Sequence, residues 1–172
     1  MHLRALRFLL LAVTAAPGAA QAPIDTLAVV TNEGFFLPDP TSATPLLFLA
    51  PSDFDPALDV LAHPATEADR VTNGFFVTAE GRLWRVRVLD LSAGTYAIDD
   101  LTPQATHVLD LFDIDVHPST GALYLLDQGS DTVLRYSPPF ALGMAPDLAI
   151  PVTTSARAMA VDSRNFPPSV RI

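Results

Sequence analysis

Short apolar runs separated by turn-forming residues make up almost the whole chain from residue 21 onward. The runs are rich in Val, Leu, Ile, Phe, Tyr and Trp, and clusters of Pro, Gly, Asp, Asn and Ser separate them. Helical periodicity is nearly absent from this region. The pattern therefore predicts an all-β fold of short strands joined by tight turns.

The clearest unit spans residues 113–136, where strands alternate with turns. The first turn contains His117 and Pro118 and ends at Gly121, and the second contains Gly129. Between them, Leu123 and Leu125 alternate with other apolar residues, so both faces of this strand need burial. The stretch around Trp84 alternates with arginines instead, which predicts an outer strand with one solvated face.

Similar segments recur at intervals of about 40–45 residues, the length of a four-stranded propeller blade. The matched pairs are Glu80–Trp84 with Thr120–Tyr124, Ala158–Ser163 with Asp113–Pro118, Asn32–Leu37 with the segment from Ala79, and Val30–Phe36 with Val71–Phe76. The repeat predicts a β-propeller-like array, and the alternative is a β-sandwich.

Three segments of the chain resemble the repeats of a known group of secreted proteins. Gly121–Asp127, Leu89–Gly94 and Ala160–Asp162 are similar to repeats of six- or seven-bladed propellers of the NHL, gluconolactonase and strictosidine-synthase-like kind. The resemblance covers residues 74–163, and residues 27–73 more loosely. Gluconolactonase-like members hold a divalent ion on an acidic residue, an Asn and an Asp. We find no residue-by-residue match to that set, because Asn32, Asn73 and Asn165 each lie beside a turn.

The length of the chain predicts an incomplete array. Residues 21–172 hold about three to four units, whereas a closed propeller needs at least four. The last repeat begins at about residue 158 and is interrupted by Pro167-Pro168, where a turn and a second strand should follow. Because proline lacks the ladder donor, we expect that strand only at a sheet edge. We therefore expect a fragment of a larger propeller, or an array with open blade edges that favour self-association.

The first twenty residues have the pattern of a secretory signal peptide. Arg4 and Arg7 precede a short apolar run over residues 8–16, a Pro-Gly break follows, and cleavage is expected after Ala20. Cleavage after Ala22 and an uncleaved membrane anchor are the alternatives, although the run is about half of the ~20 residues that span a bilayer. We therefore predict an extracellular or periplasmic protein with one repeat domain at 21–172.

Charge and composition exclude several function classes. The formal charge of −9 becomes −11 once the leader is removed, and such a surface disfavours nucleic acid and anionic membranes. The chain contains no cysteine, which excludes disulfides, thiolate metal sites and a thiol nucleophile. After cleavage no further segment is long and apolar enough to span a membrane.

Asp113, Asp115 and His117 are the strongest candidates for chemistry. They alternate along one strand and therefore share a face, where two carboxylates are suitable ligands for Ca²⁺. The competing interpretation makes His117 a turn residue and the aspartates hydrated residues at a blade rim. Residues 127–131 are interpreted as a hairpin turn rather than a calcium loop. His63 and His107 are too distant in sequence to assign.

Other motifs point to structure rather than catalysis. Phe35-Phe36, Phe75-Phe76 and Trp84 are expected in the core, and the proline-rich segments 38–40 and 53–56 in loops. Nucleophile-elbow and phosphate-loop motifs are absent from the sequence. We therefore predict no catalytic or cofactor-binding residues, no cofactor other than the Ca²⁺ alternative, and a non-catalytic binding or structural module. The alternative function is a fragment of a metal-dependent lactonase or hydrolase propeller.

Overall fold

The computed structural model describes residues 27–69, 74–103, 110–153, 156–162 and 169–171. Strands form nearly all of the secondary structure, so the prediction of an all-β fold is confirmed. Several sequence-based predictions concern positions outside the described residues, namely the leader (1–20), Asn73, His107, Asn165 and Pro167-Pro168.

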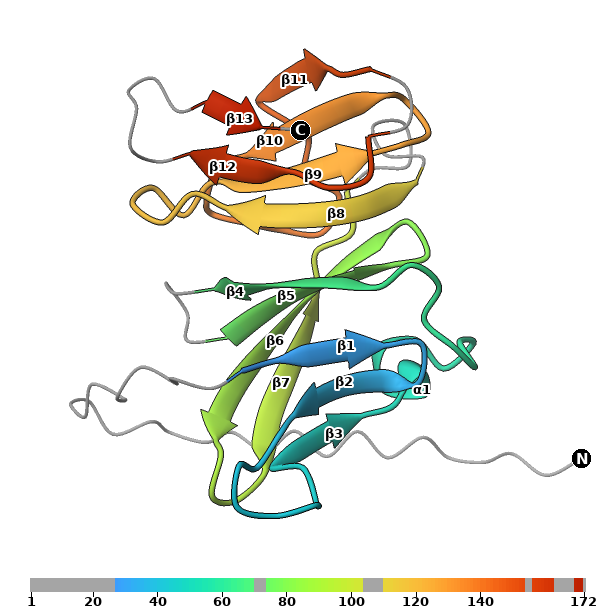
Figure 1. Ribbon diagram of the computed structural model, residues 1–172, viewed down its shortest axis with the longest axis vertical. Coiled ribbons are helices and arrows are strands. Elements are labelled where there is room, and N and C mark those ends of the chain that lie inside the picture. Colours follow the sequence, from blue (N-terminus) through green and yellow to red (C-terminus); the bar gives the residue numbers. More distant parts are fainter. Residues whose placement is uncertain (1–26, 70–73, 104–109, 154–155, 163–168, 172) are drawn as a thin grey trace, which may run out of the picture.

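Each antiparallel sheet is a meander whose strands follow one another along the chain (Figure 1). The first sheet contains β1 (Val29–Thr31), β2 (Gly34–Leu37) and β3 (Leu47–Leu49). The second contains β4 (Ala65–Asp69), β5 (Gly74–Ala79), β6 (Arg82–Asp90) and β7 (Thr95–Asp100). The third contains β8 (Leu111–Val116), β9 (Leu123–Asp127), β10 (Thr132–Tyr136) and β11 (Leu148–Pro151). The fourth pairs β12 (Ala160–Asp162) with β13 (Ser169–Arg171).

The sheets lie face to face in chain order, with apolar layers between them (Figure 1). Phe35 and Leu49 of the first sheet pack against Phe75 of the second. Phe76, which follows on the opposite face of β5, packs against Leu125 of the third sheet. A sandwich has one interior layer between two sheets. The described sheets instead form a series, and they do not close into a barrel or ring.

Strand β9 shows why the middle sheets are apolar on both faces. Leu123 and Leu125 face the second sheet, whereas Tyr124 and Leu126 face the layer that contains Met159. These four side chains are buried, as is that of Asp127 at the end of β9. The prediction that this strand is buried on both faces is therefore confirmed.

The first strands of successive sheets lie next to one another. Strand β4 lies beside β8, and β8 beside β12, although these neighbours belong to different sheets and share no ladder hydrogen bonds. Strand β1 likewise adjoins β4. One edge of the stack is thus formed by a row of first strands.

Some of the segments matched in the sequence occupy different strand positions in their sheets. The matched glycines Gly81 and Gly121 lie in different turns, because Gly81 joins the second and third strands of its sheet and Gly121 the first and second. That pairing is therefore wrong by one strand. The echo between Val30–Phe36 and Val71–Phe76 is in phase, since Gly34 and Gly74 each begin a second strand.

Both of these glycines are required by close backbone contacts. A Cβ on Gly34 would lie 2.2 Å from the carbonyl oxygen of Leu49, and one on Gly74 would lie 2.3 Å from that of Val86. In each sheet the oxygen belongs to the third strand. The repeated Gly-Phe-Phe therefore marks a site where only glycine fits between neighbouring strands.

Strand β13 begins directly after the proline pair, so the last repeat does have a second strand, and it lies at a sheet edge as expected for a strand beside prolines. Two local predictions need correction. Strand β6 has the expected wet face, with Trp84 buried and Arg85 partly exposed, but it is the third strand and β7 is the outer one. The segment at 53–56 is not entirely loop, because Phe54 ends the short helix α1 (Pro51–Phe54) and packs on Trp84.

Candidate functional site

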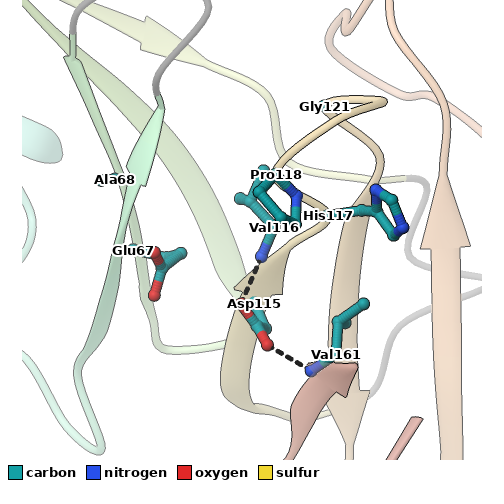
Figure 2. A pocket seen from close by; sticks show the side chains of 8 residues that line it. All are labelled: Glu67, Ala68, Asp115, Val116, His117, Pro118, Gly121 and Val161. Atoms are coloured by element: carbon teal, nitrogen blue, oxygen red, sulfur yellow. Dashed lines mark hydrogen bonds between the residues drawn. The ribbon is translucent and has the colours of Figure 1, made fainter. Parts of the chain in front are cut away.

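A pocket of about 200 Å³ lies where the first strands of three successive sheets adjoin (Figure 2). Glu67 and Ala68 come from β4, Asp115 and Val116 from β8, and Val161 from β12; the turn after β8 supplies the remaining lining residues, His117, Pro118 and Gly121. Pockets for drug-sized ligands are usually ~300–1,000 Å³. This pocket therefore has room only for a small ligand or an ion.

Asp115 is engaged in structure at the pocket wall. Its Oδ2 accepts a hydrogen bond from the main-chain N–H of Val161 at 2.5 Å, and its Oδ1 accepts one from the N–H of Val116 at 2.7 Å (Figure 2). The first of these bonds crosses from β8 to β12. The carboxylate thus connects β8 to β12, two first strands that are not paired in one sheet.

Asp113 makes the same kind of connection two residues earlier. Its Oδ2 accepts a hydrogen bond from the N–H of Met159 at 2.7 Å. Burial raises the pKa of Asp113, and the negative charge of Asp115 raises it further, while the N–H groups of Met159 and Ile114 act in the opposite direction. The two aspartates share a face as predicted, but they clamp β12 rather than standing hydrated at a rim.

His117 is buried and serves the turn that follows β8. Its Nδ1 accepts hydrogen bonds from the N–H groups of Ser119 and Thr120 at 3.4 and 3.3 Å. The N–H of Gly121 donates to the carbonyl of His117 at 2.9 Å and closes the turn. The interpretation of His117 as a turn residue is therefore confirmed, and an Nδ1 that accepts these bonds is not available to a metal.

The segment 127–131 is a hairpin turn, as predicted. Asp127 is fully buried and its Oδ1 accepts hydrogen bonds from the N–H groups of Asp110 and Gly129, at 2.7 and 3.1 Å. Its Oδ2 accepts one from the hydroxyl of Ser130 at 2.6 Å. The carboxylate thus holds the backbone of the turn between β9 and β10.

The other sequence candidates lie apart from the pocket or inside the core. His63 packs on Phe112, with ring centroids 5.5 Å apart. Phe35, Phe75, Phe76 and Trp84 are buried as predicted, whereas Phe36 is only partly buried. Among the described residues, no group of three or more His, Cys, Asp or Glu side chains is arranged to hold a metal ion.

Sequence reasoning missed the residues that β4 brings to the pocket. Val161 lies in the segment Ala158–Ser163, which the repeat matched with Asp113–Pro118 in the correct strand phase, whereas Glu67 and Ala68 belong to no motif. The signal for β4 was present in the Gly-Phe-Phe echo, which fixes β5 as a second strand and hence β4 as a first strand.

Comparison with protein-family models, with curated proteins and with solved structures gave no match for this chain. In the part of the chain that the structure describes, no helix combines the length and the apolar character needed to cross a membrane.

Proposed function

We propose that this protein is an exported, non-catalytic β-repeat module, built as an incomplete propeller-like array, that binds a small ligand or serves as a structural part. One observation carries the proposal. The first strands β4, β8 and β12 come from three successive sheets and line one pocket. Convergence of equivalent strands from stacked sheets is the arrangement by which propellers form a central channel.

The chemistry of the pocket favours binding over catalysis. Asp115 accepts two main-chain N–H groups, and Nδ1 of His117 is occupied by its own turn. Both groups are therefore committed to structure, whereas a general base must reach a substrate proton. Glu67 gives the opposite wall a second carboxylate, so the pocket suits a small polar or cationic ligand.

Protein-observed NMR with a library of small polar and cationic fragments tests this function. Binding is expected to shift the amide resonances of Ala68, Val116 and Val161, and to leave those of Leu134 on β10 unchanged. Glu67→Gln should weaken the cationic hits, with Glu33→Gln, an exposed residue outside the pocket, as the matched control. Hits that cluster elsewhere, or their absence at these amides, would refute the proposed pocket.

The metal-dependent lactonase is the second candidate. It is favoured by Glu67 and Asp115, two carboxylates from neighbouring sheets that line the same pocket. Each oxygen of Asp115 keeps a second lone pair beside its main-chain hydrogen bond. Calorimetric titration with Ca²⁺ and Zn²⁺, followed by a lactone hydrolysis assay, separates the two functions. Metal binding with turnover that is lost in Glu67→Gln would replace the non-catalytic proposal, whereas the absence of both removes the lactonase.

Export is proposed on the leader pattern of residues 1–20. Expression with the native N-terminus in a secreting host, followed by intact-mass measurement, tests it. The expected mature product begins at Gln21, and a product that keeps residue 1 in the cytoplasmic fraction contradicts it.

A further inference from the structure

The outer face of the first sheet is apolar and exposed. Leu27, Val29, Phe36, Leu46 and Phe48 form this face, on the side opposite to the residues that pack on the second sheet. Val29 pairs with Phe36 across β1 and β2, and Phe36 pairs with Phe48 across β2 and β3. The two phenylalanine rings have centroids 4.9 Å apart, and Phe48 is 47% exposed.

Exposed large apolar side chains are concentrated here. Of those that the described residues contain, Leu27, Val29, Leu46 and Phe48 lie on this one face. The others are dispersed over separate strands and loops: Val60, Leu89, Tyr96, Leu142 and Leu148. A contiguous apolar patch on a soluble protein is typical of an interaction site.

The segment that forms this face is acidic, whereas the last sheet lies in a basic segment. Residues 27–64 contain no Lys or Arg and include Glu33, Asp39, Asp53, Asp55 and Asp59. Residues 156–172 contain Arg157, Arg164 and Arg171 against Asp162 alone. The two segments at the ends of the stack therefore carry opposite net charge.

The stack itself indicates how the outer face can be covered. Inside the chain, every sheet from the first to the third packs an apolar face against the next sheet in order. The outer face of the first sheet has the same apolar character and lacks such a neighbour among the described residues. A preceding sheet in the same series would bury it.

We propose that the outer face of the first sheet docks against the β12–β13 sheet of a second copy, so that the stack continues from one chain into the next. The contact joins two different surfaces and is therefore heterologous. Three strands ~4.8 Å apart present a few hundred Å², less than the ~800 Å² per partner of a stable dimer, so the association is weak and reversible. This inference uses the order of the sheets and not the ligand pocket, so failure of either proposal leaves the other standing.

Sedimentation equilibrium of the purified protein, from low micromolar to near-millimolar concentration, tests the proposal. The mean mass should rise with concentration at low salt. In 0.5 M NaCl it should rise several-fold less steeply, because opposite charges are screened. Phe48→Ser should weaken association at least about tenfold, as should Arg157→Glu combined with Arg171→Glu. Leu142→Ser is the matched control, because Leu142 is exposed away from both surfaces and should change nothing.

Mixing the two defective variants distinguishes a heterologous contact from a symmetric one. The Phe48→Ser chain keeps a normal β12–β13 sheet, and the arginine variant keeps a normal outer face, so the mixture should form a one-to-one complex that grows no further. Circular dichroism must show that each variant remains folded. A wild-type monomer throughout, association strengthened by salt, or an arginine variant that still self-associates overturns the proposal.

Discussion

Replacing Asp113 and Asp115 by alanine removes the two acceptors that connect β8 to β12. Each single substitution leaves a partly buried main-chain N–H, that of Met159 or of Val161, without its partner. An unsatisfied group of this kind costs about 1–3 kcal/mol. One bond holds Val161 within β12 and the other holds Met159, which directly precedes β12. Losing one bond therefore already loosens β12, and the double variant should cost less than the sum of the two.

Asp113→Asn separates the hydrogen bond from the charge. The amide oxygen can still accept from Met159, while the cost of burying a carboxylate disappears. Since burial raises the pKa of Asp113 above its unfolded value, its ionised form opposes folding above that raised pKa, and the penalty is relieved as the pH falls through it. At pH 7 we therefore expect Asp113→Asn to be at least as stable as wild type, with the advantage vanishing in acid.

Urea unfolding with hydrogen exchange of individual amides measures these effects. The alanine variants should speed amide exchange at Met159 and Val161 without affecting exchange in β5. Asp59→Ala, at an exposed aspartate, should change neither the free energy of unfolding nor these exchange rates. Two results would refute the idea that Asp113 and Asp115 together hold β12. One is unchanged exchange at both amides in the double variant; the other is additive losses of unfolding free energy while β12 stays protected.

Further predictions concern the turns, the core and one ion pair. Gly74→Ala should destabilise the fold by more than about 2 kcal/mol, because its Cβ would meet a carbonyl oxygen of β6. Gly94→Ala, in open space at φ +63°, should cost only about 1 kcal/mol. Thermal melts of the two variants measure this difference. Leu125→Ala, in the layer between the second and third sheets, should cost about 2–5 kcal/mol in urea unfolding. The Arg87 guanidinium lowers the pKa of Asp99, so this pair stabilises the fold above pH ~4 and its contribution is lost as the pH falls through the lowered pKa. The stability difference between wild type and Asp99→Asn should accordingly shrink in acid, and a constant difference from pH 7 to 2 would contradict this assignment.

The sequence was sufficient to predict which faces of a strand are buried, but not which position the strand takes in its sheet. Alternation of apolar residues predicted burial of both faces at Leu123 and Leu125, since each face must meet a neighbouring sheet. The match of Gly81 with Gly121 failed because most tight turns between strands favour glycine, so glycine alone does not identify which turn of a meander it occupies. Gly34 and Gly74 were informative because a close carbonyl oxygen leaves no room for a Cβ atom at either position, whatever the backbone angle.

The candidate site was less predictable for a related reason. Alternation placed Asp113 and Asp115 on one face, but their partners are main-chain N–H groups some forty-six residues later, which side-chain patterns do not record. Glu67 reaches the same pocket only through the stacking of separate sheets. Long-range placement of this kind depends on packing between sheets rather than on local sequence.

The serial order of the sheets makes this protein nearly one-dimensional in its thermodynamics. Each sheet folds from a contiguous segment and makes its main contacts with the sheets next to it in the series. Stability is then close to a sum of sheet terms and neighbour terms, as in repeat proteins. Loss of the first sheet removes one neighbour term, whereas loss of the second or third removes two. Unfolding should accordingly proceed inward from the ends, with β5 and β9 protected longest.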